Sequence, residues 1–153
     1  MKKILAIAVA LTAFVAVAAA QPRALGVRFG SASYAAGYGA ELSYQHGLGT
    51  TNFVEIDLGW SSVGINGTAS WDYILAEFGG GFDFYAGPGA NLGMYNTADG
   101  AKFAVGALAQ VGLEYQFGTI PFNISIDWRP TFYVIPSTYF SATGVALSFR
   151  YRF

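Results

Sequence analysis

The sequence predicts an all-β fold: an eight-stranded antiparallel up-and-down transmembrane β-barrel, preceded by a cleavable signal peptide. Three observations lead to this prediction. Apolar and polar residues alternate along eight stretches, which is the period of a strand with two different faces. Charged residues make up only 11% of the 153 residues, whereas a soluble domain averages about 25%. No stretch after residue 20 approaches the ~18 consecutive apolar residues of a membrane helix, and a closed barrel is the other structure that satisfies backbone hydrogen bonds in lipid.

Residues 1–20 have the organisation of an export signal. Lys2 and Lys3 form a positive start, residues 4–17 are apolar except for Thr12, and three alanines ending at Ala20 offer a cleavage site. An uncleaved anchor helix is the alternative, but the apolar run is short for a membrane span. We expect cleavage after Ala20, so that residues 21–153 form the barrel domain.

The charge of the chain excludes several functions. The sequence has eight Lys and Arg and nine Asp and Glu; without Lys2 and Lys3, six basic residues remain against nine acidic ones, a formal charge of −3. No basic patch suggests nucleic acid as a partner. There is no cysteine for a disulfide or a lipid anchor, and no metal-ligand spacing, so we expect neither metal nor cofactor.

The first four predicted strands cover residues 25–32, 39–46, 52–60 and 69–78. In the first three, large apolar residues alternate with small, polar or charged ones, and the charged ones are Arg28, Glu41, Glu55 and Asp57. The fourth is the least regular, because bulky residues fall on both of its faces. We expect Glu77 to point inward there, since a carboxylate facing hydrocarbon is costly; a β-bulge could reverse the facing partway along.

The last four predicted strands cover residues 82–94, 103–116, 122–134 and 142–153. Alternation is clear in these strands and strict in the fifth, and the charged residues on the more polar face are Asp83, Glu114, Asp127, Arg129 and Arg150, with Arg152 at the periplasmic rim. The same face of the fifth and sixth strands carries glycines at positions 87, 89, 93, 106 and 112. Glycine there leaves room for bulky neighbours such as Tyr85 and lets the wall curve.

The lengths of the connections predict which end of the barrel faces the periplasm. Tight turns are expected at 47–50, 79–81 and 118–121, and longer loops at 33–38, 61–68, 95–102 and 135–141. Short and long connections alternate, as do the periplasmic turns and extracellular loops of outer-membrane barrels. An even number of strands returns both termini to the periplasmic side.

The distribution of charge predicts which face meets lipid. Because the aliphatic and aromatic residues share one face, that face is expected to point outward; a soluble lipocalin-type barrel would show the reverse. The inward charged residues are Arg28, Glu41, Glu55, Asp57, Asp83, Glu114, Asp127, Arg129 and Arg150. The arginines come from the seventh, eighth and first strands, so we expect a basic wall facing acidic ones. The favoured interpretation is a structural plug of ion pairs; a gated ion path or a ligand site is the alternative.

Aromatic residues gather near the ends of the predicted strands. They are Trp60, Tyr95, Trp128, Phe149, Tyr151 and Phe153. This position is typical of the aromatic girdles at the two membrane interfaces.

The end of the chain carries the most specific motif, Phe149-x-Tyr151-x-Phe153. It resembles the carboxy-terminal β-signal read by the barrel assembly machinery, although Ser148 stands where that signal usually has glycine. With this motif, the chain resembles the small outer-membrane β-barrels of Gram-negative bacteria, the OmpA/OmpX-like eight-stranded group. The resemblance implies location in the outer membrane and contact with its lipid. It also implies secretion machinery, periplasmic chaperones and the assembly machinery as partners during biogenesis, and an envelope protein is a further possible partner.

Function is less determined than location. We expect a structural or interaction role in the bacterial envelope, with a narrow pore for ions or small solutes as the alternative. A lipid-modifying enzyme is a third hypothesis, and His46, the only histidine, would have to serve it. His46 falls on the outward face at the periplasmic end, whereas the enzymes of similar barrels act at the other end. We therefore predict no enzymatic activity and no catalytic residues.

Overall fold

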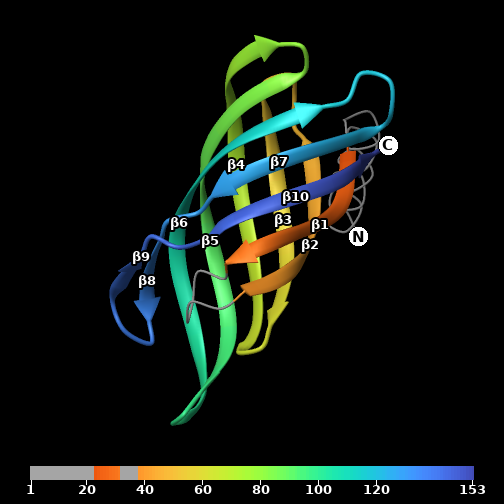
Figure 1. Cartoon of the computed structure of the whole chain (residues 1–153). Coiled ribbons are helices and arrows are strands. Elements are labelled where there is room, and N and C mark those ends of the chain that lie inside the picture. The colour runs from red at the N-terminus through yellow and green to blue at the C-terminus, as the bar shows by residue number, and fades with distance from the viewer. Residues whose placement is uncertain (1–22, 32–37) are drawn as a thin grey trace, which may run out of the picture.

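The computed structural model describes residues 23–31 and 38–153. These residues form one antiparallel sheet that closes on itself (Figure 1). In chain order, the strands are β1 (Arg23–Ser31), β2 (Tyr38–Gly47), β3 (Asn52–Ser61), β4 (Gly64–Gly79), β5 (Phe82–Thr97), β6 (Gly100–Gln116), β7 (Phe122–Trp128), β8 (Thr131–Ile135), β9 (Tyr139–Ser141) and β10 (Val145–Arg152).

The sheet is an eight-stranded barrel, because two of its wall positions are each built from two short strands. β7 and β8 both pair with β6 and together form the seventh position. β9 pairs with β8, and β10 pairs with β7, so these two form the eighth. β10 then pairs with β1, which closes the ring. The predicted all-β, eight-stranded antiparallel barrel is confirmed.

The seventh and eighth predicted strands are interrupted, which the alternation did not indicate. The seventh breaks at Arg129 and Pro130, because proline has no N–H to donate to a ladder. Pro130 instead accepts a hydrogen bond from the Ala109 N–H at 3.1 Å, and the Arg129 N–H donates to the Gly144 carbonyl at 3.2 Å. Gly144 has φ +108°, a left-handed conformation that favours glycine, and it lies where the eighth position breaks.

Two predicted long loops are wrong, because the residues in them continue the ladder. Ser61 pairs with Gly64, and Thr97 pairs with Gly100, so each connection has only two residues outside the strands. Asn66, within the predicted loop 61–68, lies inside β4 and donates a side-chain hydrogen bond to Glu41 at 3.0 Å. The predicted loop 135–141 is shortened by β9. Residues 33–37 of the first predicted loop lie outside the described residues.

The irregular pattern of β4 results from a bulge. Asp72 is buried, while Trp71 is 47% exposed. The register shifts between Ile74 and Ala76, and Glu77 then lies opposite Asp83 on β5. Residues directly opposite in an antiparallel pair project to the same face, so the bulge returns Glu77 to the inward side. The expected inward Glu77 and the suggested bulge are both found.

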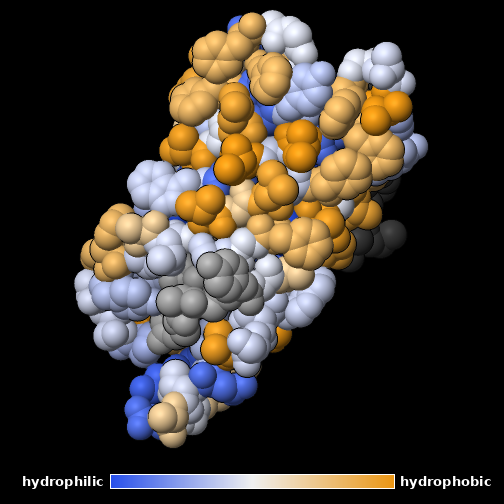
Figure 2. All heavy atoms as spheres, in the orientation of Figure 1, coloured by the Kyte–Doolittle hydropathy of each residue, from blue (hydrophilic) through white to orange (hydrophobic). Residues whose placement is uncertain are grey.

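The two faces of the wall differ sharply in polarity. Large apolar side chains point outward and are about half exposed, and apolar residues cover much of the face seen in Figure 2. They include Phe29, Leu58, Leu75, Leu92, Phe103, Ile126 and Leu147. The buried residues are mostly polar or charged. Apolar residues therefore lie outside and polar ones inside, the reverse of a soluble barrel.

Glycine on the inner wall makes room for an aromatic ring, which predicts a packing defect on substitution. A Cβ at Gly112 would collide with the ring of Tyr85, which is fully buried, whereas a Cβ at Gly118 would meet nothing within 4 Å. We expect Gly112→Ala to lower the free energy of unfolding by about 1–3 kcal/mol, the usual cost of overpacking, and Gly118→Ala to change it by less than about 0.5 kcal/mol. Urea titration of the folded barrel measures both.

A second substitution distinguishes this collision from a general intolerance at position 112. In a Tyr85→Leu background the ring is absent, so Gly112→Ala should cost clearly less than in the wild type. Equal costs in the two backgrounds would show that Tyr85 is not the reason for the glycine.

Candidate functional site: the charged lumen

Three arginines project into the lumen from neighbouring wall positions. Arg28 belongs to β1, Arg150 to β10, and Arg129 follows β7 directly. β10 lies between β1 and β7 in the sheet, so these cations share one side of the barrel. Their exposed fractions are only 4%, 0% and 3%. Buried charges of this kind need partners, and the lumen of an eight-stranded barrel is just wide enough for side chains from opposite walls to meet.

Arg129 is the centre of the resulting network. Its Nη2 lies 2.5 Å from Glu55 Oε1 and 2.7 Å from Asp57 Oδ2. Its Nη1 lies 3.4 Å from Glu41 Oε2, and its Nε lies 3.4 Å from Asp127 Oδ1. One guanidinium group thus contacts four carboxylates from three wall positions.

Arg28, on β1, contacts two of these four carboxylates as well, those of Asp127 and Glu41. Its Nη2 and Nε donate to Asp127 Oδ1 at 2.5 and 3.1 Å, and its Nη1 donates to Glu41 Oε2 at 2.6 Å. Nη2 also reaches the carbonyl of Gly144 at 3.2 Å. This last contact connects the network to the break before β10.

Arg150 completes the cationic set, nearer the end of the barrel where β1 begins and β10 ends. Its Nη2 donates to Glu55 Oε1 at 2.8 Å, and the other two nitrogens donate to Ser43 Oγ at 2.8 Å and Ser125 Oγ at 2.9 Å. All three guanidinium nitrogens therefore have partners, which offsets the cost of removing the cation from water.

Amide side chains carry the network further along the lumen. Gln45 Nε2 donates to Glu55 Oε2 at 2.9 Å and to Glu114 Oε2 at 3.1 Å. Gln116 Nε2 then connects Glu114 Oε1 and Asp83 Oδ2, both at 3.0 Å. Glu114 and Asp83 are thus connected through amides, and no arginine or lysine of the described residues lies within ion-pair distance of either.

The structure places all nine predicted lumen residues on the inward face. Seven of them form the ion-pair network: Arg28, Glu41, Glu55, Asp57, Asp127, Arg129 and Arg150. Glu114 is buried beside the network, and Asp83 lies nearer the mouth of the barrel.

Sequence reasoning missed one buried carboxylate, Asp72, and the neighbouring inward Ser70. Asp72 is fully buried and accepts a hydrogen bond from Ser70 at 2.6 Å, and Ser70 Oγ lies 3.1 Å from Gln110 Oε1. Ser70 and Asp72 alternate with Trp71 and Tyr73, which was a usable signal. The bulge after Ile74 hid it, because a single alternation does not fit the whole strand.

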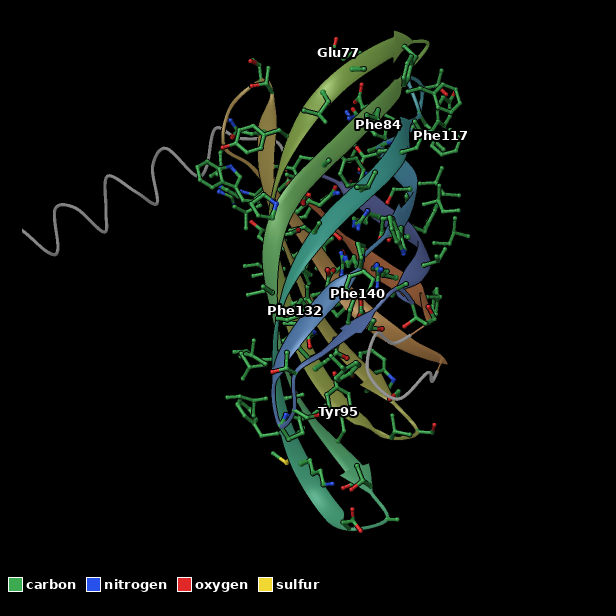
Figure 3. All side chains as sticks on the ribbon, turned by 90° about the vertical axis from the view of Figure 1, so that its left-hand side faces the viewer. Glu77, Phe84, Tyr95, Phe117, Phe132 and Phe140 are labelled. Carbon is green, nitrogen blue, oxygen red and sulfur yellow. The ribbon has the colours of Figure 1, made fainter. Side chains whose placement is uncertain are left out.

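Aromatic residues close the lumen at the end opposite the start of β1 and the end of β10. Tyr95, Ala104 and Tyr133 are buried together, with Val63 and Tyr139 packed against them. The rings of Tyr133 and Tyr139 stack with centroids 4.9 Å apart. Tyr95 was expected in an outward aromatic girdle; that expectation is wrong, because β5 continues past Met94 and keeps odd-numbered residues inward. Tyr95 and Glu77 are seen near opposite ends of the molecule in Figure 3.

The other end, where β1 begins and β10 ends, is hollow instead. We call it the terminal end; it includes Arg23, Arg152 and the turn between β2 and β3. A cavity of about 540 Å³ opens there, with the amides Gln45 and Gln116 among its lining residues. The ion-pair network therefore lies between an aromatic closure at one end and a cavity at the other.

The terminal motif forms an exposed aromatic patch on the outer wall. Phe149, Tyr151 and Phe153 are 47%, 48% and 62% exposed. Phe122 stacks on Phe149 with ring centroids 5.0 Å apart and meets Tyr151 edge-on at 5.4 Å. His46 lies on the outward face as well, where its Nδ1 is 3.1 Å from Tyr44 OH.

Residues 23–31 and 38–153 contain no helix long and apolar enough to cross a membrane. Within the same residues, no group of three or more His, Cys, Asp or Glu side chains is arranged to hold a metal ion. Searches of protein-family models, of curated proteins and of solved structures found no significant match to this chain.

The central position of Arg129 predicts a large loss of stability when its charge is removed. Arg129→Met keeps much of the side-chain volume but leaves Glu55 and Asp57 without their closest cation, which should cost about 3–5 kcal/mol. Lys102→Met is the matched control, since among the described residues Lys102 pairs only with Asp99, which is 81% exposed, and such pairs contribute about 0–1 kcal/mol. Urea titration of the folded barrel compares them.

A compensating substitution tests the same network. Asp57→Asn removes one carboxylate that Arg129 neutralises, so Arg129→Met should cost less in the Asp57→Asn background than alone. If Arg129→Met were as mild as Lys102→Met, the ion pairs would not be holding the barrel together.

Proposed function

We propose that this chain is an exported outer-membrane β-barrel of a Gram-negative bacterium. In this proposal residues 1–20 are removed, and the mature barrel has a structural or interaction role in the envelope. The observation that supports it most is the polarity of the wall: Leu58 and Phe103 are 59% and 53% exposed, while Glu55 and Asp57 are fully buried. A surface of that kind is stable in hydrocarbon and unfavourable in water.

The filled lumen supports a role other than transport. Arg129 and Arg150 reach across to Glu55, with all of these side chains 3% exposed or less. A solute crossing the barrel would have to separate these ion pairs, and breaking one buried pair costs about 3–5 kcal/mol. Beyond the network it would meet the ring of Tyr133, which is fully buried. The narrow pore remains the less favoured alternative.

The exposed aromatic patch supports recognition by the barrel assembly machinery. Phe149, Tyr151 and Phe153 project from one face of the chain at and just after β10. An assembly machinery that pairs with the edge of this strand would contact them there. Kinship with the OmpA/OmpX-like group belongs to the same proposal and rests on this motif and on the strand number.

The filled lumen predicts that the protein conducts no ions. Single-channel recording in planar bilayers should show no steady conductance for the mature protein at neutral pH, because the ion-pair network occupies the cross-section. Protease protection of the same preparation confirms that the protein has inserted. Long-lived, reproducible current steps from inserted protein would favour the pore instead.

The terminal phenylalanine predicts an assembly defect without a folding defect. Phe153→Ala should lower the amount of folded barrel in the outer membrane of expressing cells severalfold, yet refold in detergent like the wild type, because the residue ends the strand and packs only at the surface. Phe140→Ala is the matched control, since Phe140 is also 62% exposed but lies on β9. Cell fractionation and heat-dependent gel mobility measure both.

Equal assembly of the two variants would mean that the terminal aromatic residue is not a signal. A Phe153→Ala protein that also failed to refold in detergent would assign the residue to stability.

A further inference from the structure

The cavity at the terminal end has a floor made of hydrogen-bonding side chains. Gln45, Glu114, Gln116 and Asn123 form this floor, and Arg23, Glu77, Asp83 and Arg152 form the rim. The rim carries charges of both signs, so it favours neither anions nor cations strongly. The choice of ligand therefore depends on the side chains of the floor.

The orientation of the floor amides follows from Glu55. This carboxylate is bound to both Arg129 and Arg150, so it is ionised and can only accept hydrogen bonds. The Gln45 atom that lies 2.9 Å from it must be the nitrogen. The oxygen of Gln45 then faces Asn123 at 3.2 Å and needs a donor, so the near atom of Asn123 is Nδ2.

Asn123 is consequently left with an unused acceptor. It is 2% exposed and lines the cavity, and its Oδ1 has no hydrogen-bond partner among the described residues. A buried carbonyl oxygen without a partner is costly, which makes this atom a position where a ligand donor would be stabilised.

Glu114 provides a second set of acceptors beside it. The side chain is 7% exposed, and each carboxylate oxygen accepts one amide hydrogen bond, from Gln45 or from Gln116. A carboxylate has about four acceptor positions, so about two are unused. Unlike Glu55, Glu114 has no arginine or lysine of the described residues in contact with it.

The remaining lining suits a carbon chain. Phe53 and Ile74 form apolar parts of the cavity wall, and a methylene stem packs well on such surfaces while its charged head reaches polar partners. A volume of about 540 Å³ is within the range of small-molecule sites and far larger than a bare metal ion needs.

We propose that this cavity binds a primary alkylammonium group, with its N–H donors on Glu114 and Asn123 Oδ1 and its methylene stem along Phe53 and Ile74. A free aliphatic polyamine and a lysine side chain of a protein present the same head group. The inference does not depend on membrane insertion, since the site is formed by the folded barrel alone.

The test uses the mature barrel folded in nonionic detergent micelles, with the side-chain amide signals of Asn123 and Gln116 followed by NMR. Spermidine should shift both signals saturably. A spermidine analogue methylated until every nitrogen is quaternary carries the same number of positive charges but no N–H donor, so it should bind at least about tenfold more weakly. Equal binding of the two, tighter binding of Ca²⁺ than of spermidine, or no saturable shift would each overturn the proposal.

A blocked lysine-containing tripeptide is the second probe. Tighter binding of spermidine assigns the site to free polyamines, and tighter binding of the peptide assigns it to a protein partner. Both results support the alkylammonium site, whereas failure of both probes contradicts it.

Two variants locate the site. Glu114→Gln keeps the shape of the floor and removes its charge, so it should weaken spermidine binding at least about tenfold. Glu77→Gln removes a carboxylate from the rim and should change binding by less than about threefold. Undiminished binding by a folded Glu114→Gln protein would overturn the assignment. If that variant does not fold, the wild-type comparison of spermidine with its fully quaternised analogue still tests the proposal.

Discussion

A charge that is buried without a partner costs free energy. In this protein that cost is avoided mainly through the contacts of Arg129. Its guanidinium group contacts carboxylates from β2, β3 and β7, so positions on opposite sides of the ring are joined through one side chain. Arg28 and Arg150 extend the same set of contacts towards the two ends. The barrel thus has a polar interior that is held in place by directional bonds, where most domains have an apolar core.

The outer wall and the lumen depend on each other through the two-residue period of the strand. Each inward polar residue requires its neighbours to face outward, so a dense polar interior imposes a dense apolar exterior. Trp128 beside Asp127 and Arg129 illustrates this: the tryptophan is 41% exposed and the two charged residues are buried. A shift of one residue in the register of a strand would turn its inward residues outward and its outward residues inward.

The strand number, the closure and the face of every charged lumen residue except Asp72 were predictable because they follow from alternation, which is a local property. Asp72 and Tyr95 were not, for two different reasons. A bulge after Ile74 changes the phase within β4, and β5 extends through residues that resemble a loop. The partners of each arginine depend on register between distant strands, so no local pattern specified that Arg129 would meet Glu55. The cavity was beyond prediction too, because it depends on the relative lengths of neighbouring strands.

The unequal length of those strands leaves a projecting hairpin at the end opposite the cavity. β5 and β6 remain paired as far as Thr97 and Gly100, beyond the last pair of β4 with β5 at Gly64 and Tyr95, and their tip extends past the rest of the sheet in Figure 1. The sixteen residues of β5 span about 50 Å. A foreign peptide inserted between Ala98 and Asp99 would therefore be displayed at the tip of this hairpin, away from the ion pairs that hold the barrel.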